Sequence, residues 1–138
     1  MLNSGLFTSE TCEWNTPASV YAVLDAEFHF THDSAPEGYA ELWSSLTESW
    51  QGTIFCNPPY GRTIGQWIQK GYESAQAGAT VIMLIPSRTD TAWWHDFVMK
   101  ADQIRFIRGR LKFSGTKWNA PFPSVIIVFQ SSASGLQN

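Results

Sequence analysis

The stretch Thr53-Ile54-Phe55-Cys56-Asn57-Pro58-Pro59-Tyr60-Gly61 decides how this chain folds. Its first four residues form an apolar run that is typical of a buried strand in a parallel sheet. The strand must end at Asn57, because two consecutive prolines supply no N–H to a sheet and keep the residues before them out of the helical region. The chain is therefore predicted to be extended where it leaves the sheet.

An extended Asn-Pro-Pro-Tyr segment offers two hydrogen-bond acceptors and one aromatic face. The carbonyl of Pro58 is not used by a ladder, and the side chain of Asn57 supplies a second acceptor, while Pro59 fixes the geometry of both. Tyr60 can stack on a planar base, an interaction typically worth about 1–3 kcal/mol. Hydrogen bonds to Asn57 and Pro58 would favour a pyramidal nitrogen in an amine such as that of adenine, freeing its lone pair to attack. In a duplex, the base must first be flipped out.

Six segments of the chain resemble, in the same order, conserved blocks of the phage-encoded DNA adenine N6-methyltransferases (Dam-like). They are Trp14-Asn15-Thr16-Pro17, Asp33-Ser34-Ala35, Asn57-Pro58-Pro59-Tyr60, Ile85-Pro86-Ser87-Arg88-Thr89-Asp90-Thr91, Arg105-Phe106-Ile107-Arg108-Gly109-Arg110-Leu111-Lys112-Phe113 and Ala120-Pro121-Phe122-Pro123-Ser124. Together they cover roughly residues 6–130. Glutamine and rRNA methyltransferases share the four-residue motif, so the ordered set is far more specific than the motif alone.

The resemblance implies a reduced Rossmann-like methyltransferase core that uses S-adenosylmethionine. This α/β fold would have a mostly parallel sheet flanked by helices, in one domain over residues 1–130, with residues 131–138 as a flexible tail. The catalytic residues would be Asn57, Pro58, Pro59 and Tyr60, and the cofactor would be bound by Thr16, Pro17, Asp33 and Ala35. From the residues alone, Thr16-Pro17 merely begins a helix.

The chain departs from the family pattern around Asp33. Where the family usually has Phe-x-Phe-Asp-Leu-Asp-Pro-Ala-Ala, this sequence has Thr31 and His32 in place of the first Asp and the Leu, and Pro36 in place of the last Ala. Only 18 residues, from Ser34 to Gln51, separate the first expected strand from the next. They leave no room for the two further strands of a full methyltransferase, one of which carries an acid for the cofactor ribose; Glu37 is a weak substitute.

The charge of the 138-residue chain is segregated. Residues 1–61 carry a charge of −8 without any Lys or Arg, and residues 62–138 carry +5, which gives the net charge of −3. Such asymmetry indicates one surface that faces a polyanion. Between Arg105 and Lys117 there are five bases and no acid. The candidate DNA contacts are therefore Arg88, Arg105, Arg108, Arg110 and Lys112. The alternatives are a surface ion pair for Arg88 and a solvated strand face for the rest.

The remaining local predictions follow hydrophobic periodicity and capping signals. We expect helices from Thr16-Pro17 to about Glu27, from Pro36 onward, from a capping box at Thr63 and Gln66 to Gly78, and one capped by Asp90. We expect strands at 28–32, 53–56, 80–85, 104–108, 110–113 and 125–129. Phe113, or else Phe122, would cover the flipped base opposite Tyr60, as an aromatic does in related enzymes; each could instead pack beneath its loop.

Cysteine content and hydropathy indicate the cellular compartment in which the protein works. Cys12 and Cys56 are far apart, which is typical of a reducing cytosol, and the longest apolar run is too short to cross a bilayer. We expect a soluble cytoplasmic protein, in the host bacterium if it is phage-encoded, with no membrane contact. His29, His32 and His95 lie on different faces and elements, so we expect no metal.

The sequence favours an enzyme that methylates adenine N6 in DNA, and two alternatives stay open. The substrate could be RNA adenine or a protein glutamine, or the chain could be a binding protein that keeps the fold without cofactor binding. No insertion is large enough for a recognition domain, so sequence selectivity would be lax, supplied by loops, or shared with a second subunit in a homodimer.

Overall fold

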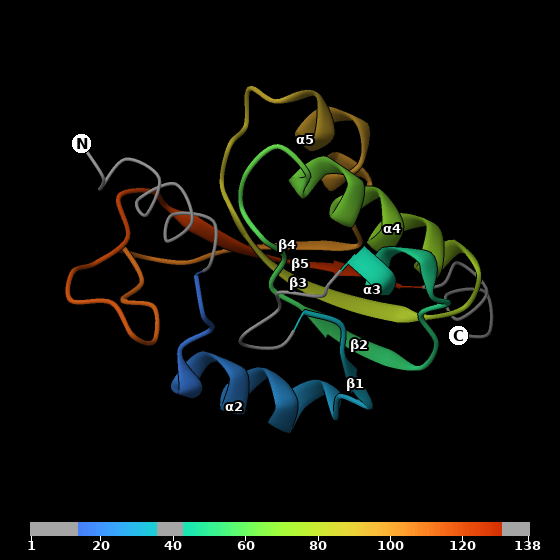
Figure 1. Ribbon diagram of the computed structural model, residues 1–138, viewed down its shortest axis with the longest axis horizontal. Coiled ribbons are helices and arrows are strands. Elements are labelled where there is room, and N and C mark those ends of the chain that lie inside the picture. The colour runs from blue at the N-terminus through green and yellow to red at the C-terminus, as the bar shows by residue number, and fades with distance from the viewer. Residues whose placement is uncertain (1–13, 36–42, 131–138) are drawn as a thin grey trace.

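The computed structural model describes residues 14–35 and 43–130. Five strands form one sheet in the order β1-β2-β3-β5-β4. The strands are β1 (His32–Asp33), β2 (Thr53–Cys56), β3 (Thr80–Pro86), β4 (Gln103–Phe106) and β5 (Ser124–Phe129). The helices are α2 (Ala18–Phe28), α3 (Trp43–Thr47), α4 (Ile64–Gln76) and α5 (Ala92–Asp96), with a 3-10 turn at Val98–Lys100. Helix α2 covers one face of the sheet, and α4 covers the other (Figure 1).

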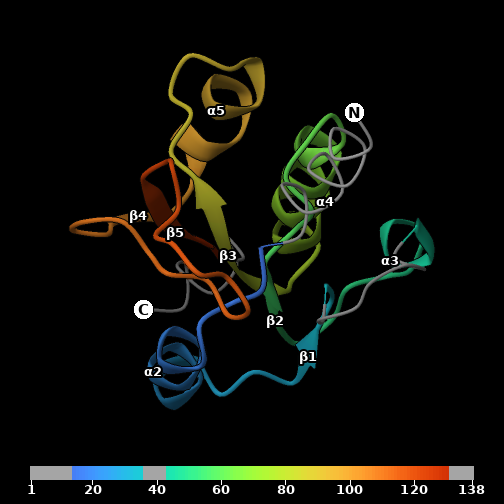
Figure 2. The ribbon, with the colours of Figure 1, turned by 60° about the vertical axis from the view of Figure 1, so that its left-hand side comes forward.

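The sheet is mixed and not mostly parallel as predicted, because two of its four described strand pairs are antiparallel. The β1–β2 and β2–β3 pairs are parallel, whereas β5 is antiparallel to both β3 and β4. The predicted α/β fold with flanking helices is therefore confirmed. The parallel half is the half that carries the Asn-Pro-Pro-Tyr segment, and Figure 2 shows β1, β2 and β3 side by side in that half.

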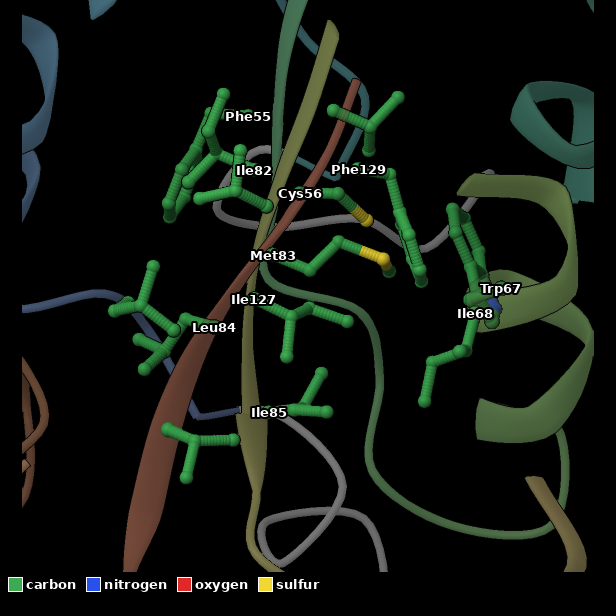
Figure 3. Close-up of a cluster of buried hydrophobic side chains, with 14 of the residues drawn as sticks. Phe55, Cys56, Trp67, Ile68, Ile82, Met83, Leu84, Ile85, Ile127 and Phe129 are labelled. Carbon is green, nitrogen blue, oxygen red and sulfur yellow. The ribbon is translucent and has the colours of Figure 1, made fainter. Parts of the chain in front are cut away.

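The core lies between the sheet and α4. Met83 and Ile127 point toward Trp67 and Ile68 of α4, while Phe55 and Ile82 point to the other face (Figure 3). This alternation is what a strand buried on both faces requires. Gly71 lets α4 approach closely, since a Cβ there would lie 2.8 Å from the Met83 sulfur.

The helix predicted from Thr63 to Gly78 is confirmed as α4, but its capping box is wrong. The buried residues of the helix are Ile64, Trp67, Ile68, Gly71, Ser74 and Ala75. Thr63 has φ −92° and ψ 0° and makes no side-chain cap hydrogen bond. Because a capping residue needs an extended backbone to aim its hydroxyl at the first turn, the sequence signal of Thr63 and Gln66 is not realised.

Two other predicted helix starts are shifted by one residue. Thr91, not Asp90, caps α5, and its hydroxyl accepts a hydrogen bond from the backbone N–H of Trp94 at 3.2 Å. At α2 the cap position belongs to Pro17, not to Thr16. The hydroxyl of Thr16 is thereby free of the helix and takes a partner elsewhere. The predicted helix from Pro36 falls partly outside the described residues, whose first helical residue there is Trp43.

The strand predicted over residues 28–32 is wrong for all but its last residue, because β1 is His32–Asp33. Phe28 is the last residue of α2, and His29 follows it in a left-handed conformation, φ 57° and ψ 70°. Leu24 and Phe28 are four residues apart, a helical spacing that the alternation of Phe28 and Phe30 obscured. Pairing begins only where the backbone N–H of Thr31 donates to the carbonyl of Thr53 at 2.8 Å.

The strand predicted over residues 110–113 is also wrong. Leu111 and Phe113 face inward and Arg110 and Lys112 are exposed, so the alternation of burial is present without a ladder. The segment instead folds as part of a long loop between β4 and β5, which extends beyond the sheet (Figure 1). The predicted strands at 53–56, 80–85 and 125–129 are confirmed, and the prediction for 104–108 matches β4 in part.

Candidate active site

A cavity of about 290 Å³ lies at the carboxyl ends of β1 and β2. Open α/β sheets place their ligands at this edge. The parallel register pairs Asp33, the last residue of β1, with Phe55 of β2. Asn57 follows Phe55 by two residues, so it leaves the sheet at the same edge as Asp33. The described lining residues are Trp14, Asn15, Thr16, Ala18, Tyr21, Asp33, Ala35 and Asn57. The fold therefore brings the predicted cofactor residues Thr16, Asp33 and Ala35 to one cavity with Asn57.

The side-chain amide of Asn57 is held in one orientation. Its Nδ2 donates to the backbone carbonyl of Trp14 and to the Thr16 hydroxyl, the latter at 3.0 Å. A carbonyl can only accept, so the nitrogen and not the oxygen must face Trp14. Both N–H groups of the amide are thereby used, and its oxygen points elsewhere.

The Oδ1 atom of Asn57 is buried and has no hydrogen-bond partner among the described residues. Leaving a buried acceptor unpaired costs about 1–3 kcal/mol, and such atoms need an explanation in a folded protein. The atom is shielded from solvent, so a ligand reaches it only when neighbouring groups move aside. An acceptor of this kind on the residue that lines the cavity is suited to receive a donor from a bound molecule.

Asp33 supplies negative charge to the same cavity. Burial raises the pKa of its carboxyl group, although a hydrogen bond from the Ala35 backbone N–H to Oδ1, at 3.0 Å, acts in the opposite direction. That bond orients the carboxylate along the cavity wall. Burial also raises the pKa of Tyr21, which faces Asp33 from α2. A cationic amine is the natural partner for Asp33.

The ring of Tyr60 lies outside the described cavity lining. It is only 4% exposed, and its hydroxyl donates to the Leu84 carbonyl at 3.0 Å. Phe113 and Phe122 meet it edge-on, with ring centroids at 6.3 and 5.6 Å. Trp14 packs edge-on against both phenylalanines. These four side chains form an aromatic cluster, and in this arrangement Tyr60 contacts protein rings at the positions predicted to enclose a base.

The three prolines of the predicted site lie where β2 ends and where α2 begins. Pro58 is buried and Pro59 half-buried directly after β2. Pro17 begins α2 and is not among the described lining residues. Ala18 and Tyr21 line the cavity although they were not predicted; they stand one and four residues after Pro17, so the helical period from that residue was the available signal.

The predicted DNA-contacting cations do not line the cavity in the described structure. Arg88, Arg108, Arg110 and Lys112 are exposed, the first in the turn after β3 and the others in the loop after β4. Arg105 forms two 2.7 Å hydrogen bonds with the Glu27 carboxylate, which lower the pKa of Glu27 and raise that of Arg105. Its guanidinium also lies 5.2 Å from the Phe28 ring centroid. Arg105 therefore ties β4 to α2.

Two further findings concern the described residues as a set. None of their helices is long and apolar enough to span a membrane. Within residues 14–35 and 43–130, no three His, Cys, Asp or Glu side chains gather in a way that could hold a metal ion.

The fold and site define an α/β protein with a polar cavity at the carboxyl edge of its sheet, and Asn57 of the Asn-Pro-Pro-Tyr segment lines that cavity. Residues 3–131 match the family model described as DNA N-6-adenine-methyltransferase (Dam). The chain belongs to this family of DNA adenine methyltransferases. No curated protein matches the chain.

Proposed function

We propose that the chain methylates the N6 amine of adenine in DNA, with S-adenosylmethionine as methyl donor and a reduced Rossmann-like methyltransferase core. Family membership supports the substrate and the reaction class. The parallel strands β1, β2 and β3, with the cavity at their carboxyl ends, support the core. The observation that carries the proposal is the fixed amide of Asn57. This residue lines the same cavity as Asp33, and its buried oxygen has no partner among the described residues.

The chemistry of the cavity suits the methionine end of S-adenosylmethionine. That end carries an ammonium group, which the partly buried carboxylate of Asp33 would pair with, while Thr16 and Ala35 line the same space. When bound, the cofactor supplies an electrophilic methyl group: the N6–methyl bond forms as the sulfur–methyl bond breaks, and one N–H proton leaves to solvent. Asp33 is the single carboxylate of the described lining, so no described residue is assigned to the ribose.

The catalytic contribution of the chain is positioning and hydrogen bonding. Asn57 Oδ1 and the carbonyl of Pro58 accept the two N–H groups of the target amine and favour a pyramidal nitrogen. Among the described residues, no backbone N–H donates to the Pro58 carbonyl, so this acceptor is available. Pro59 keeps the segment extended, and Tyr60 stacks on the base once Phe113 or Phe122 has moved from its edge-on position.

The cations of the loop after β4 would hold the DNA backbone. Arg108, Arg110 and Lys112 are exposed, and no acid interrupts the sequence from Arg105 to Lys117. Charge of this kind binds phosphates without reading sequence. Arg88 joins this set from the turn after β3, while Arg105 would have to exchange Glu27 for a phosphate.

The test is incubation with methyl-labelled cofactor and unmethylated DNA, followed by nucleoside analysis. Label in N6-methyladenine is the expected result. RNA and a glutamine-containing protein mixture are incubated in parallel. Label found only in RNA or only in protein would show that this material, and not DNA, is the substrate. Calorimetry with S-adenosylmethionine is run on the same sample, because absent binding would leave a protein that keeps the fold without the reaction.

A further inference from the structure

We infer that Ser114 is a positioning residue that holds the segment Trp14–Thr16 against the catalytic amide of Asn57. The inference deepens the proposed function and rests on it. Ser114 lies in the loop after β4, in the middle of the acid-free cationic stretch. It contacts the segment through hydrogen bonds that the sequence did not indicate.

Two hydrogen bonds join Ser114 to the segment. Its backbone N–H donates to the Asn15 carbonyl at 2.9 Å, and its hydroxyl donates to the Thr16 carbonyl at 3.1 Å. Asn15 and Ser114 form an isolated antiparallel bridge, so the contact is a short piece of sheet between chain segments 98 or more residues apart. The hydroxyl of Ser114 is directed at the residue whose own side chain holds Asn57.

The same segment determines where the amide of Asn57 points. Asn57 Nδ2 donates to the Trp14 carbonyl and to the Thr16 hydroxyl. The segment is neither helix nor strand beyond its single bridge. Its position therefore depends on individual contacts, among them the hydrogen bonds to Asn57 and Ser114 and the packing of the Trp14 ring. A shift of Thr16 would release the amide, and Oδ1 would lose its defined direction toward the substrate amine.

Ser114 also connects this arrangement to the surface that would bind DNA. Lys112 and Lys117 flank it within three residues and are exposed. A phosphate bound by these cations would therefore contact the same loop that holds Thr16 through Ser114. The consequence is that loss of the Ser114 hydroxyl should slow turnover while leaving the affinities for DNA and cofactor largely unchanged, since Ser114 is uncharged and is not among the described residues that line the cavity.

The test compares Ser114→Ala with Ser114→Thr and with Ser124→Ala. A hydrogen bond in a folded protein contributes about 0.5–1.5 kcal/mol, so kcat should fall about two- to twelvefold in Ser114→Ala. The Kd values for DNA and cofactor should stay within twofold of the wild type, and Ser114→Thr, which keeps a hydroxyl, should restore kcat. Ser124 is the matched control, because its buried hydroxyl has no partner among the described residues.

An NMR measurement without substrate completes the experiment. The side-chain amide signals of Asn57 should shift or broaden in Ser114→Ala and stay in place in Ser114→Thr and Ser124→Ala. Unmoved signals, or equal losses of kcat in Ser114→Ala and Ser124→Ala, would overturn the inference. Because this readout needs no turnover, it distinguishes failure of the inference from failure of the proposed function, in which the wild-type protein would itself leave DNA unmethylated.

Discussion

Asn57 Nδ2 donates a 3.0 Å hydrogen bond to the hydroxyl of Thr16, across 41 residues of chain. The bond joins the end of β2 to the residue just before α2, and it requires Pro17 rather than Thr16 to occupy the helix cap. The Thr16 hydroxyl and the Trp14 carbonyl together accept both N–H groups of the Asn57 amide. The amide oxygen, which has no partner among the described residues, is therefore the atom left for a substrate. Catalysis in the proposed reaction depends on this orientation.

Replacing Asn57 by Ala should lower kcat by about 10²–10³-fold, the cost typical of removing one preorganised hydrogen-bonding group. Cofactor affinity should be almost unaffected, since Asp33 and the rest of the lining remain. Methyl transfer and calorimetry measure the two effects separately. Gln76→Ala, which removes an exposed carboxamide at the end of α4, is the control. Unchanged turnover in Asn57→Ala would remove this residue from the mechanism.

Replacing Thr16 by Val keeps the shape of the side chain and removes the acceptor for Asn57 Nδ2. A buried donor without a partner costs about 1–3 kcal/mol, so the free energy of unfolding in urea should fall by about this amount. Turnover should fall as well, because the amide is no longer fixed. Thr16→Ser keeps the hydroxyl and should retain most of both properties. Equal behaviour of the Val and Ser variants would show that the hydrogen bond has no role.

The sequence indicated which residues share a cavity, but not the contacts among them. The resemblance assigned Asp33 and Ala35 to the cofactor and Asn57 to catalysis, and the structure places all three residues in the lining of one cavity. The role of Thr16 as a partner of Asn57 was not predictable, because a Thr-Pro pair before a helix is an ordinary capping signal. A contact across 41 residues has no local signature.

The errors in the fold share a physical cause. Alternating apolar residues were read as strands at 28–32 and 110–113, but a strand also needs a neighbour to pair with. Phe28 instead ends α2 and packs half-buried against the core, and Phe113 packs among Tyr60, Phe122 and Trp14. Packing of Phe113 beneath its loop was one of two alternatives that the sequence left open, and only tertiary structure determined the backbone conformation there.

Replacing Asp33 by Asn should weaken binding of S-adenosylmethionine roughly tenfold, or about 1.4 kcal/mol, by removing the charge that faces its ammonium group. The wild-type affinity should also weaken as the pH falls through the raised pKa of Asp33, since only the carboxylate attracts a cation. Calorimetry between weakly acidic and neutral pH measures this dependence, and Asp33→Asn should flatten it. An identical pH profile in both proteins would place the ammonium group elsewhere.

The raised pKa of Asp33 has the opposite effect on the protein without ligand. The folded state binds the proton of this carboxyl group more tightly than the unfolded state does, so the stabilisation from Asp33 is complete below its unfolded pKa. It is lost as the pH rises through the folded pKa. The free energy of unfolding of Asp33→Asn, measured in urea relative to that of the wild type, should therefore be higher at neutral pH than at acidic pH. A stability difference that does not vary with pH would show that burial does not perturb this group.

Replacing Arg108 and Arg110 together by Gln should weaken DNA binding and reduce its dependence on salt. Each phosphate contact on duplex DNA contributes about 0.9 to the slope of log K against log salt concentration, so losing two should reduce the slope by about 1.8. Both side chains are exposed and distant in sequence from the cavity residues, so cofactor affinity should be unchanged. Lys70→Gln with Lys100→Gln removes the same charge from α4 and the 3-10 turn, and this control should keep the wild-type slope. Because the control matches the change in net charge, an equal reduction in both double variants would mean that DNA senses the total charge of the protein and not the loop after β4.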